Sequence, residues 1–131
     1  TAQAADFVAE KPDRLEESVS QGGTNFSGGQ RQRLCIARAL AAKPLVYVFD
    51  DSFSALDVAT DARLREALGR TTGESTVVVV AQRVSTIRDA DQILVLDDGK
   101  IVGRGTHDEL LETNATYQEI VESQLTAEGV N

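Results

Sequence analysis

The sequence predicts an α/β fold with a parallel sheet, because two strand-like runs flank one helix-like segment. The apolar runs Leu45–Phe49 and Thr76–Ala81 have the continuous hydrophobicity of strands that are buried on both faces. Between them, Asp57–Leu68 has the apolar spacing of an amphipathic helix. The order strand, helix, strand predicts a right-handed crossover, in which the two strands are parallel neighbours.

Two further helices are predicted before the first strand. Ala2–Glu10 carries apolar residues at helical spacing, and Pro12 prevents its continuation. A second helix is expected from Ser27 to about Ala42, with Pro44 just beyond its end. Cys35 lies in the apolar pattern of this helix, so we expect it to be a small buried side chain.

The C-terminal third predicts a hairpin followed by two helices. A strand is expected at Ile93–Asp97, and Asp98-Gly99 predicts a tight turn into a second strand because glycine adopts a positive φ without cost. Thr106–Glu109 fits a capping box that begins a helix through Leu111. A last amphipathic helix is expected from the spacing of Tyr117, Ile120, Val121 and Leu125.

Composition limits the classes of protein that are possible. The chain has 131 residues, with 13 Lys plus Arg against 21 Asp plus Glu and a formal net charge of −8. Proteins that bind a nucleic-acid backbone carry basic surfaces, so we expect no nucleic-acid partner. No apolar run approaches the roughly 20 residues that a membrane-spanning helix needs. Since the sequence contains no Met, we expect it to be a portion of a longer protein.

The start of the second predicted helix is a candidate phosphate site. Its capping box consists of Ser27, Gly28, Gly29 and Gln30. Each glycine in a helix costs about 1 kcal/mol relative to alanine, so a cap alone does not account for two of them. Glycine exposes backbone N–H groups to an anion at the positive end of the helix dipole. With Arg31 and Arg33 nearby, a phosphate is the favoured ligand, and a plain helix cap is the alternative.

Two acids at the end of the first predicted strand are candidates for metal and catalytic roles. Asp50 and Asp51 stand where open α/β sheets place their ligand crevices. Adjacent like charges are unfavourable unless a cation or hydrogen bonds compensate them. One acid would hold Mg²⁺ while the other orients a nucleophilic water. The alternative is a solvated turn after a strand.

Several motifs together identify a family. Three segments occur in order: Phe26–Arg33, Leu45–Asp50 and Ser54–Asp57. They resemble the signature motif, the Walker B strand and the D-loop of the ABC-transporter nucleotide-binding domain, exporter type. Ser18–Gly23 occupies the position of the family's X-loop, and Ile93–Glu109 is similar to its C-terminal stretch. The resemblance covers nearly the whole chain.

The resemblance implies the fold, the ligands and the partners. The fold would be an α/β P-loop NTPase core with a parallel sheet, comprising a helical subdomain with the signature helix (1–43), a Walker B to switch-loop core (44–103) and C-terminal helices (104–131). ATP and Mg²⁺ would be the cofactors. The partners would be a second nucleotide-binding domain and a transmembrane domain, at the cytoplasmic face of the cell membrane.

The same resemblance assigns roles to individual residues. Ser27, Gly28, Gly29 and Gln30 would contact the γ-phosphate of ATP held by the opposing domain. Asp50 would support Mg²⁺ in this chain's own site. Ser54 and Asp57 would touch the partner at the nucleotide interface and couple the two sites.

Two positions depart from the family pattern. Asp51 stands where the family usually has a catalytic glutamate, and Gln82 stands where it usually has the switch histidine. Asp is one methylene shorter, and a misplacement of about 1 Å can cost on the order of 10²-fold in rate. Gln cannot protonate near pH 7. The pair resembles the degenerate-site subunit of heterodimeric exporters and predicts a non-identical partner, and tolerated substitutions in a working homodimer are the alternative.

The motif G-x-x-x-x-G-K-[ST] does not occur in the sequence. In the family this loop lies upstream of the signature motif, so we expect the Walker A half to be missing. The portion alone should bind ATP weakly, lack activity and expose strand edges that favour self-association. Two other functions remain open: a soluble ABC ATPase of DNA-repair or chromosome-organising type, and a phospho-receiver domain that uses Asp50 and Asp51.

Overall fold

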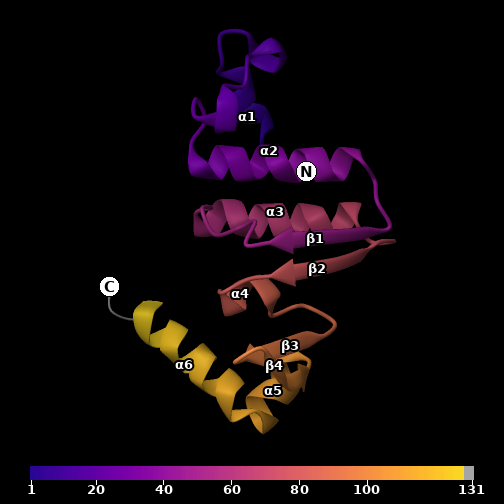
Figure 1. Ribbon diagram of the computed structural model, residues 1–131, viewed down its shortest axis with the longest axis vertical. Coiled ribbons are helices and arrows are strands. Elements are labelled where there is room, and N and C mark those ends of the chain that lie inside the picture. Colours follow the sequence, from indigo (N-terminus) through magenta and orange to yellow (C-terminus); the bar gives the residue numbers. More distant parts are fainter. Residues whose placement is uncertain (129–131) are drawn as a thin grey trace. The chain divides into compact units, whose positions relative to one another are not determined.

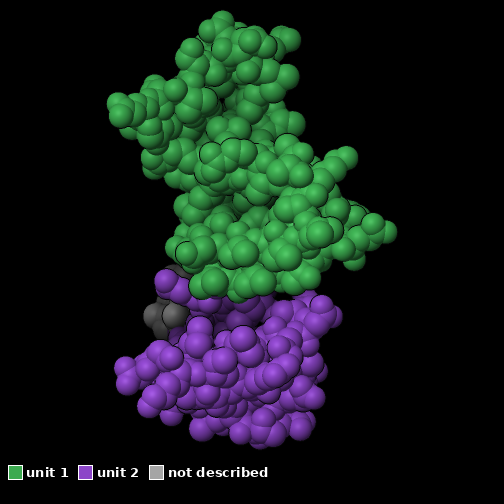
Figure 2. Space-filling view, turned by 45° about the vertical axis from the view of Figure 1, so that its right-hand side comes forward, with its two compact units in different colours: residues 1–80 green, residues 81–131 purple. Residues whose placement is uncertain are grey.

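The computed structural model describes residues 1–128 of the chain and has two compact units, residues 1–80 and 81–131 (Figure 2). Residues 129–131 of the predicted C-terminal segment lie outside the described residues. Within the described part, no helix has both the length and the apolar character needed to cross a bilayer.

Unit 1 contains the predicted strand–helix–strand segment and the helices before it (Figure 1). Its elements are α1 (Ala5–Ala9), the short 3₁₀ turns η1 (Arg14–Glu16) and η2 (Gln21–Gly23), α2 (Gly28–Ala41), β1 (Val46–Asp50), α3 (Val58–Thr71) and β2 (Thr76–Val80). The helices predicted from Ser27 and Asp57 are confirmed, because these two residues are the N-caps of α2 and α3. Helix α1 occupies only the later part of its predicted range.

Strands β1 and β2 pair in parallel, as the crossover predicts. The prediction that both of their faces are buried is wrong for the described residues. Tyr47 and Phe49 are buried, whereas Val46 is 53% and Val48 is 66% exposed. On β2, Val78 and Val80 are exposed as well. The reason is that the core side chains of α2 and α3 pack against the face that carries Tyr47, and the other face has no comparable cover within unit 1.

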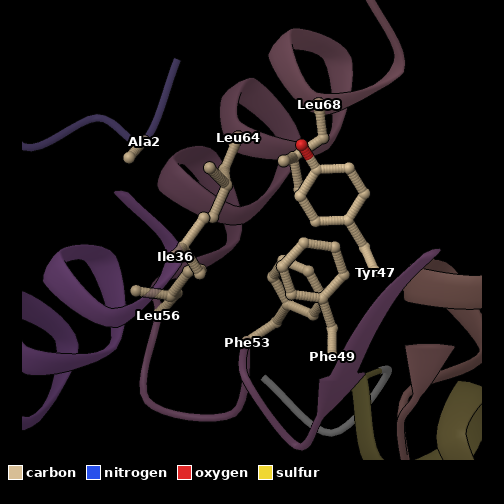
Figure 3. Packing of buried hydrophobic residues seen from close by; sticks show 8 residues of the cluster. All are labelled: Ala2, Ile36, Tyr47, Phe49, Phe53, Leu56, Leu64 and Leu68. Carbon is tan, nitrogen blue, oxygen red and sulfur yellow. The ribbon is translucent and has the colours of Figure 1, made fainter. Parts of the chain in front are cut away.

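The core of unit 1 is aromatic and lies beneath the loop that follows β1 (Figure 3). The rings of Tyr47 and Phe49 are stacked, with centroids 5.9 Å apart, and Phe53 lies 5.5 Å from Phe49. Leu64 and Leu68 of α3 and Ile36 of α2 complete the packing. Aromatic pairs of this kind stabilise a fold by roughly 0.5–1.5 kcal/mol beyond the effect of their buried area. This packing therefore holds the start of the loop in place.

Unit 2 contains α4 (Val84–Ile87), β3 (Ile93–Asp97), β4 (Lys100–Gly105), α5 (His107–Thr113) and α6 (Ala115–Glu128). The predicted hairpin is confirmed: β3 and β4 are antiparallel, and Asp98 and Gly99 both have positive φ, of 45° and 71°. The predicted capping box of α5 is present. Helix α6 packs through Tyr117, Ile120 and Val121, whereas Leu125 is exposed.

Candidate functional site

The first turn of α2 presents two adjacent backbone donors. The capping box is complete: the amide of Gln30 donates to Ser27 Oγ at 3.2 Å, and the amide of Ser27 donates to Gln30 Oε1 at 3.0 Å. An α-helix leaves its first four N–H groups without intrahelical partners, and this box satisfies two of them. The remaining two belong to Gly28 and Gly29, at the positive end of the helix dipole.

The two glycines differ in their surroundings. A Cβ on Gly29 would lie 2.9 Å from the carbonyl oxygen of Ala55, whereas a Cβ on Gly28 would be in ordinary contact, 3.6 Å from the Ala55 Cβ. Close packing against the loop after β1 therefore explains the glycine at 29. The sequence interpretation, which attributed both glycines to anion access, missed this packing role.

Arg33 and Arg31 have different positions near this turn. The guanidinium of Arg33 donates to the carbonyl oxygens of Gln3, at 2.9 Å, and Gly29, at 3.4 Å, and lies over the ring of Phe7. Arg33 thus holds the N-terminal segment against α2, in contrast to the phosphate role predicted for it. Arg31 is exposed and donates to the carbonyl oxygen of Gly22.

The two candidate acids lie at the carboxyl end of β1. Asp50 is its last residue and Asp51 follows with φ of 47°, a left-handed conformation that Asp tolerates better than most residues. The amide of Asp51 donates to the Val80 carbonyl at 3.0 Å, which continues the ladder between the strands. Both carboxylates face solvent.

These acids fit a metal that takes few protein ligands. The described residues contain no group of three or more His, Cys, Asp or Glu side chains arranged to hold a metal. Mg²⁺ commonly takes one or two carboxylates and completes its octahedron with phosphate oxygens and water. An exposed carboxylate such as that of Asp50 is chemically compatible with this mode of binding.

Gln32 connects α2 to the loop after β1. Its Nε2 donates to the Asp51 carbonyl and to Ser54 Oγ, each at 3.1 Å, and its Oε1 accepts from the Ala55 amide at 3.0 Å. Ser54 Oγ also donates to the Asp51 carbonyl, at 3.0 Å. Sequence reasoning missed Gln32, although it lies one turn after Gly29 on the same side of the helix and could have been identified by that spacing.

An open depression of about 450 Å³ joins these elements. Its lining includes Gly28, Arg31, Cys35, Asp50 and Asp51. The structure thus brings the first turn of α2 and the two acids to one surface. Cys35 is exposed there, contrary to the prediction of burial, because the neighbouring Ile36 takes the core position on α2.

Asp57 caps α3 and stays ionised. Its Oδ1 accepts from the Thr60 amide at 2.9 Å, and this hydrogen bond is the main cause that lowers the pKa of Asp57 below its ordinary value of 3.8. The carboxylate is exposed at the helix start. Its position is therefore set by α3 rather than by the loop itself.

Gln82 belongs to unit 2, whereas the other predicted site residues belong to unit 1. Its carbonyl accepts from Gln124 Nε2 at 2.7 Å, and Gln124 Oε1 accepts from the Val84 amide at 2.8 Å. One side-chain amide of α6 therefore spans the segment that carries Gln82 and leads into α4. Gln124 was not singled out by the sequence analysis.

Comparison with known proteins identifies the family. The ABC transporter family matches residues 2–54. An uncharacterized ABC transporter ATP-binding protein of Mycobacterium bovis is 54% identical over 123 residues, which are 94% of this chain and 21% of that protein. The chain belongs to the ABC transporter ATP-binding domains.

Two further relatives of this ABC domain are exporters or flippases by description. An ATP-dependent lipid A-core flippase of Photobacterium profundum is 44% identical over 119 residues, which are 91% of this chain and 20% of the flippase. A bacterial Atm1-family ABC exporter with ATP bound has a TM-score of 0.89 and 36% identity, and the match covers 94% of this chain and 22% of that one. The α/β fold with a parallel strand pair agrees with that structure. The chain spans about a fifth of the length of each of these three proteins.

Proposed function

We propose that this ABC domain binds and hydrolyses ATP in an exporter and that the two ends of its unit 1 depression serve different ATP sites. The observation that carries the proposal is the first turn of α2, whose Gly28 and Gly29 amides have no intrahelical partner. Paired amides at a helix start suit a phosphate. We expect ATP to supply this phosphate, and two kinds of similar protein support this: relatives described as ABC transporter proteins, and a structural neighbour with ATP bound.

Ser27, Gly28, Gly29 and Gln30 would contact the γ-phosphate of ATP held by an opposing domain. The capping box fixes the turn before any ligand arrives, because Ser27 and Gln30 hold each other through two hydrogen bonds. Such preorganised donors stabilise developing negative charge most effectively. Ser54 and Asp57 would lie at the same interface, where Asp57 remains charged because its pKa is lowered.

Asp50, Asp51 and Gln82 would serve the chain's own site. Asp50 would hold Mg²⁺, which neutralises charge on the phosphates. Asp51 would orient the attacking water and accept its proton, and its short side chain would do so poorly. Gln82 would donate a hydrogen bond to the transferred group without supplying a proton.

This division predicts a non-identical second nucleotide-binding domain and a transmembrane domain at the cytoplasmic face of the membrane. The partner would carry the Glu and the His that Asp51 and Gln82 replace. This chain alone would be inactive, because the phosphate loop is absent from its sequence.

The signature role is tested by Gly28→Glu in the full-length protein. A Cβ at Gly28 meets only ordinary contacts, so the new carboxylate should occupy the phosphate position without disturbing the turn. Steady-state ATP hydrolysis should fall by roughly tenfold or more. The matched control is Gly69→Glu on α3, where a Cβ meets nothing within 4 Å. Wild-type hydrolysis by Gly28→Glu would refute the role.

The impaired site is tested by Asp51→Glu combined with Gln82→His. With the partner's own site inactivated, so that only this site turns over, the double substitution should raise the hydrolysis rate by up to about 10²-fold if these residues limit the site. Asp98→Glu is the control, because Asp98 is another exposed aspartate with a left-handed backbone. An unchanged or lower rate in the double variant would favour the homodimer in which both residues are tolerated.

A further inference from the structure

Gln32 lines the depression, and its side chain joins α2 to the loop after β1. It lies in the second turn of α2, half-buried, one turn after the capping box. Both hydrogens of an amide can donate, and Gln32 Nε2 donates to the Asp51 carbonyl and to Ser54 Oγ. Its Oε1 accepts from Ala55. A single side chain therefore fixes three points of the loop that carries Asp51.

The loop also contacts α2 through backbone packing. The Ala55 carbonyl lies where a Cβ on Gly29 would be only 2.9 Å away. Gly29 and Gln32 are three residues apart and share one helix face, so two successive turns hold the same loop. A displacement of the helix tip must therefore change either these contacts or the position of the loop.

The Asp51 peptide has little freedom to move independently. Its amide donates to Val80 on β2, and its carbonyl accepts from Gln32 and Ser54. The aromatic core beneath the loop, with Phe53 buried against Phe49, resists a shift away from α2. Movement of α2 is thus transmitted to the orientation of Asp51.

We propose that Gln32 is a positioning residue that couples the two ATP sites: phosphate contact at Ser27–Gln30 moves α2, and Gln32 transfers that movement to the peptide of Asp51. The inference rests on the proposed function, since it requires a partner's nucleotide at the helix tip. It adds that occupancy of one site sets the geometry of the other through this amide.

The test uses the full-length protein in lipid nanodiscs together with its partner domain. Hydrolysis is measured against ATP concentration, and binding is measured separately with a fluorescent ATP analogue. Gln32→Met keeps the length of the side chain and removes all three hydrogen bonds. Gln32→Glu keeps the acceptor for the Ala55 amide and removes both donors. Gln118→Met is the matched control, because Gln118 is another half-buried glutamine whose Nε2 donates to a backbone carbonyl, that of Leu111.

The wild-type protein should hydrolyse ATP with positive cooperativity between two sites. Both Gln32 variants should lower the Hill coefficient to about 1, with the affinity for the analogue unchanged within about twofold. Gln118→Met should behave as wild type. A purely structural Gln32 would instead lower binding and hydrolysis together with the unfolding temperature.

Three results would overturn the inference. Gln32 variants with a wild-type Hill coefficient would show that the amide transmits nothing. Parallel loss of binding, rate and thermal stability would assign Gln32 to the fold alone. Non-cooperative hydrolysis by the wild type would exclude coupling while leaving the proposed function in place, whereas absence of both binding and hydrolysis would overturn the proposed function itself.

Discussion

Gly29→Ala should destabilise unit 1, although alanine is the better helix former. The added Cβ would lie 2.9 Å from the Ala55 carbonyl oxygen, a backbone atom that cannot rotate away. Ordinary contact begins near 3.4 Å, so helix and loop must separate by about half an ångström. Overpacking of this kind costs about 1–3 kcal/mol. The entropic gain of Gly→Ala, about 0.4–1 kcal/mol, offsets part of it and leaves a loss of roughly 1–2 kcal/mol.

The neighbouring glycine provides an internal control. Gly28→Ala adds a Cβ in ordinary contact, 3.6 Å from the Ala55 Cβ, and should be neutral or stabilising by up to about 1 kcal/mol. Equilibrium unfolding in urea, followed by far-ultraviolet circular dichroism, gives both values when the m-values agree. If Gly29→Ala proved as stable as Gly28→Ala, the contact between α2 and the loop would not be tight, and the packing explanation of Gly29 would fail.

Three further outcomes are expected. Asp57→Asn keeps a cap for the Thr60 amide and removes a carboxylate whose pKa is lowered. The free energy of unfolding, measured by urea titration, should therefore fall less steeply in this variant as the pH drops through 3.8. Gln124→Met should accelerate hydrogen exchange of the Val84 amide, which loses its acceptor. Burial raises the pKa of Tyr117 above 10.0, an effect that Arg88 partly offsets, so Tyr117→Phe should reduce the loss of stability as pH rises above 10.

Each of these expectations can be contradicted. An acid limb of unchanged slope in Asp57→Asn would show that other carboxylates determine acid stability. Unchanged exchange at Val84 would mean that α6 does not hold the segment of Gln82. An alkaline limb as steep in Tyr117→Phe as in the wild type would assign that limb to groups other than the buried phenol.

Local signals predicted most of the elements. Three helices begin after a side chain that accepts a hydrogen bond from an amide of the first turn, namely Ser27, Asp57 and Thr106. This effect is short-range, so it can be predicted from neighbouring residues in the sequence. The hairpin at Asp98-Gly99 follows from the same kind of local chemistry. Burial was predicted less well. The valines of β1 and β2 predict a sheet that is covered on both faces. Whether a face is covered depends on other segments of the chain, however, and in unit 1 one face of the sheet stays exposed.

The sequence patterns identified the residues at the two ends of the depression, but they did not identify the side chain that connects these ends. Capping and strand position identified the Ser27–Gln30 turn and the acids Asp50 and Asp51. The link through Gln32 depends on a loop more than fifteen residues away, and no periodicity encodes that distance. For Arg33 the sequence suggested a role that the contacts do not support. Its charge predicted a phosphate ligand, whereas its guanidinium contacts the Gln3 carbonyl and the Phe7 ring.

The left-handed backbone of Asp51 affects how acids at this position can be compared. Asp stabilises such a conformation by short-range hydrogen bonding, and Glu does so less well. Exchanging the two therefore alters the conformational energy of the peptide as well as the reach of the carboxylate. Asn shares the backbone tolerance of Asp and lacks its charge, so a series of Asp, Asn and Glu separates a geometric contribution to turnover from an electrostatic one.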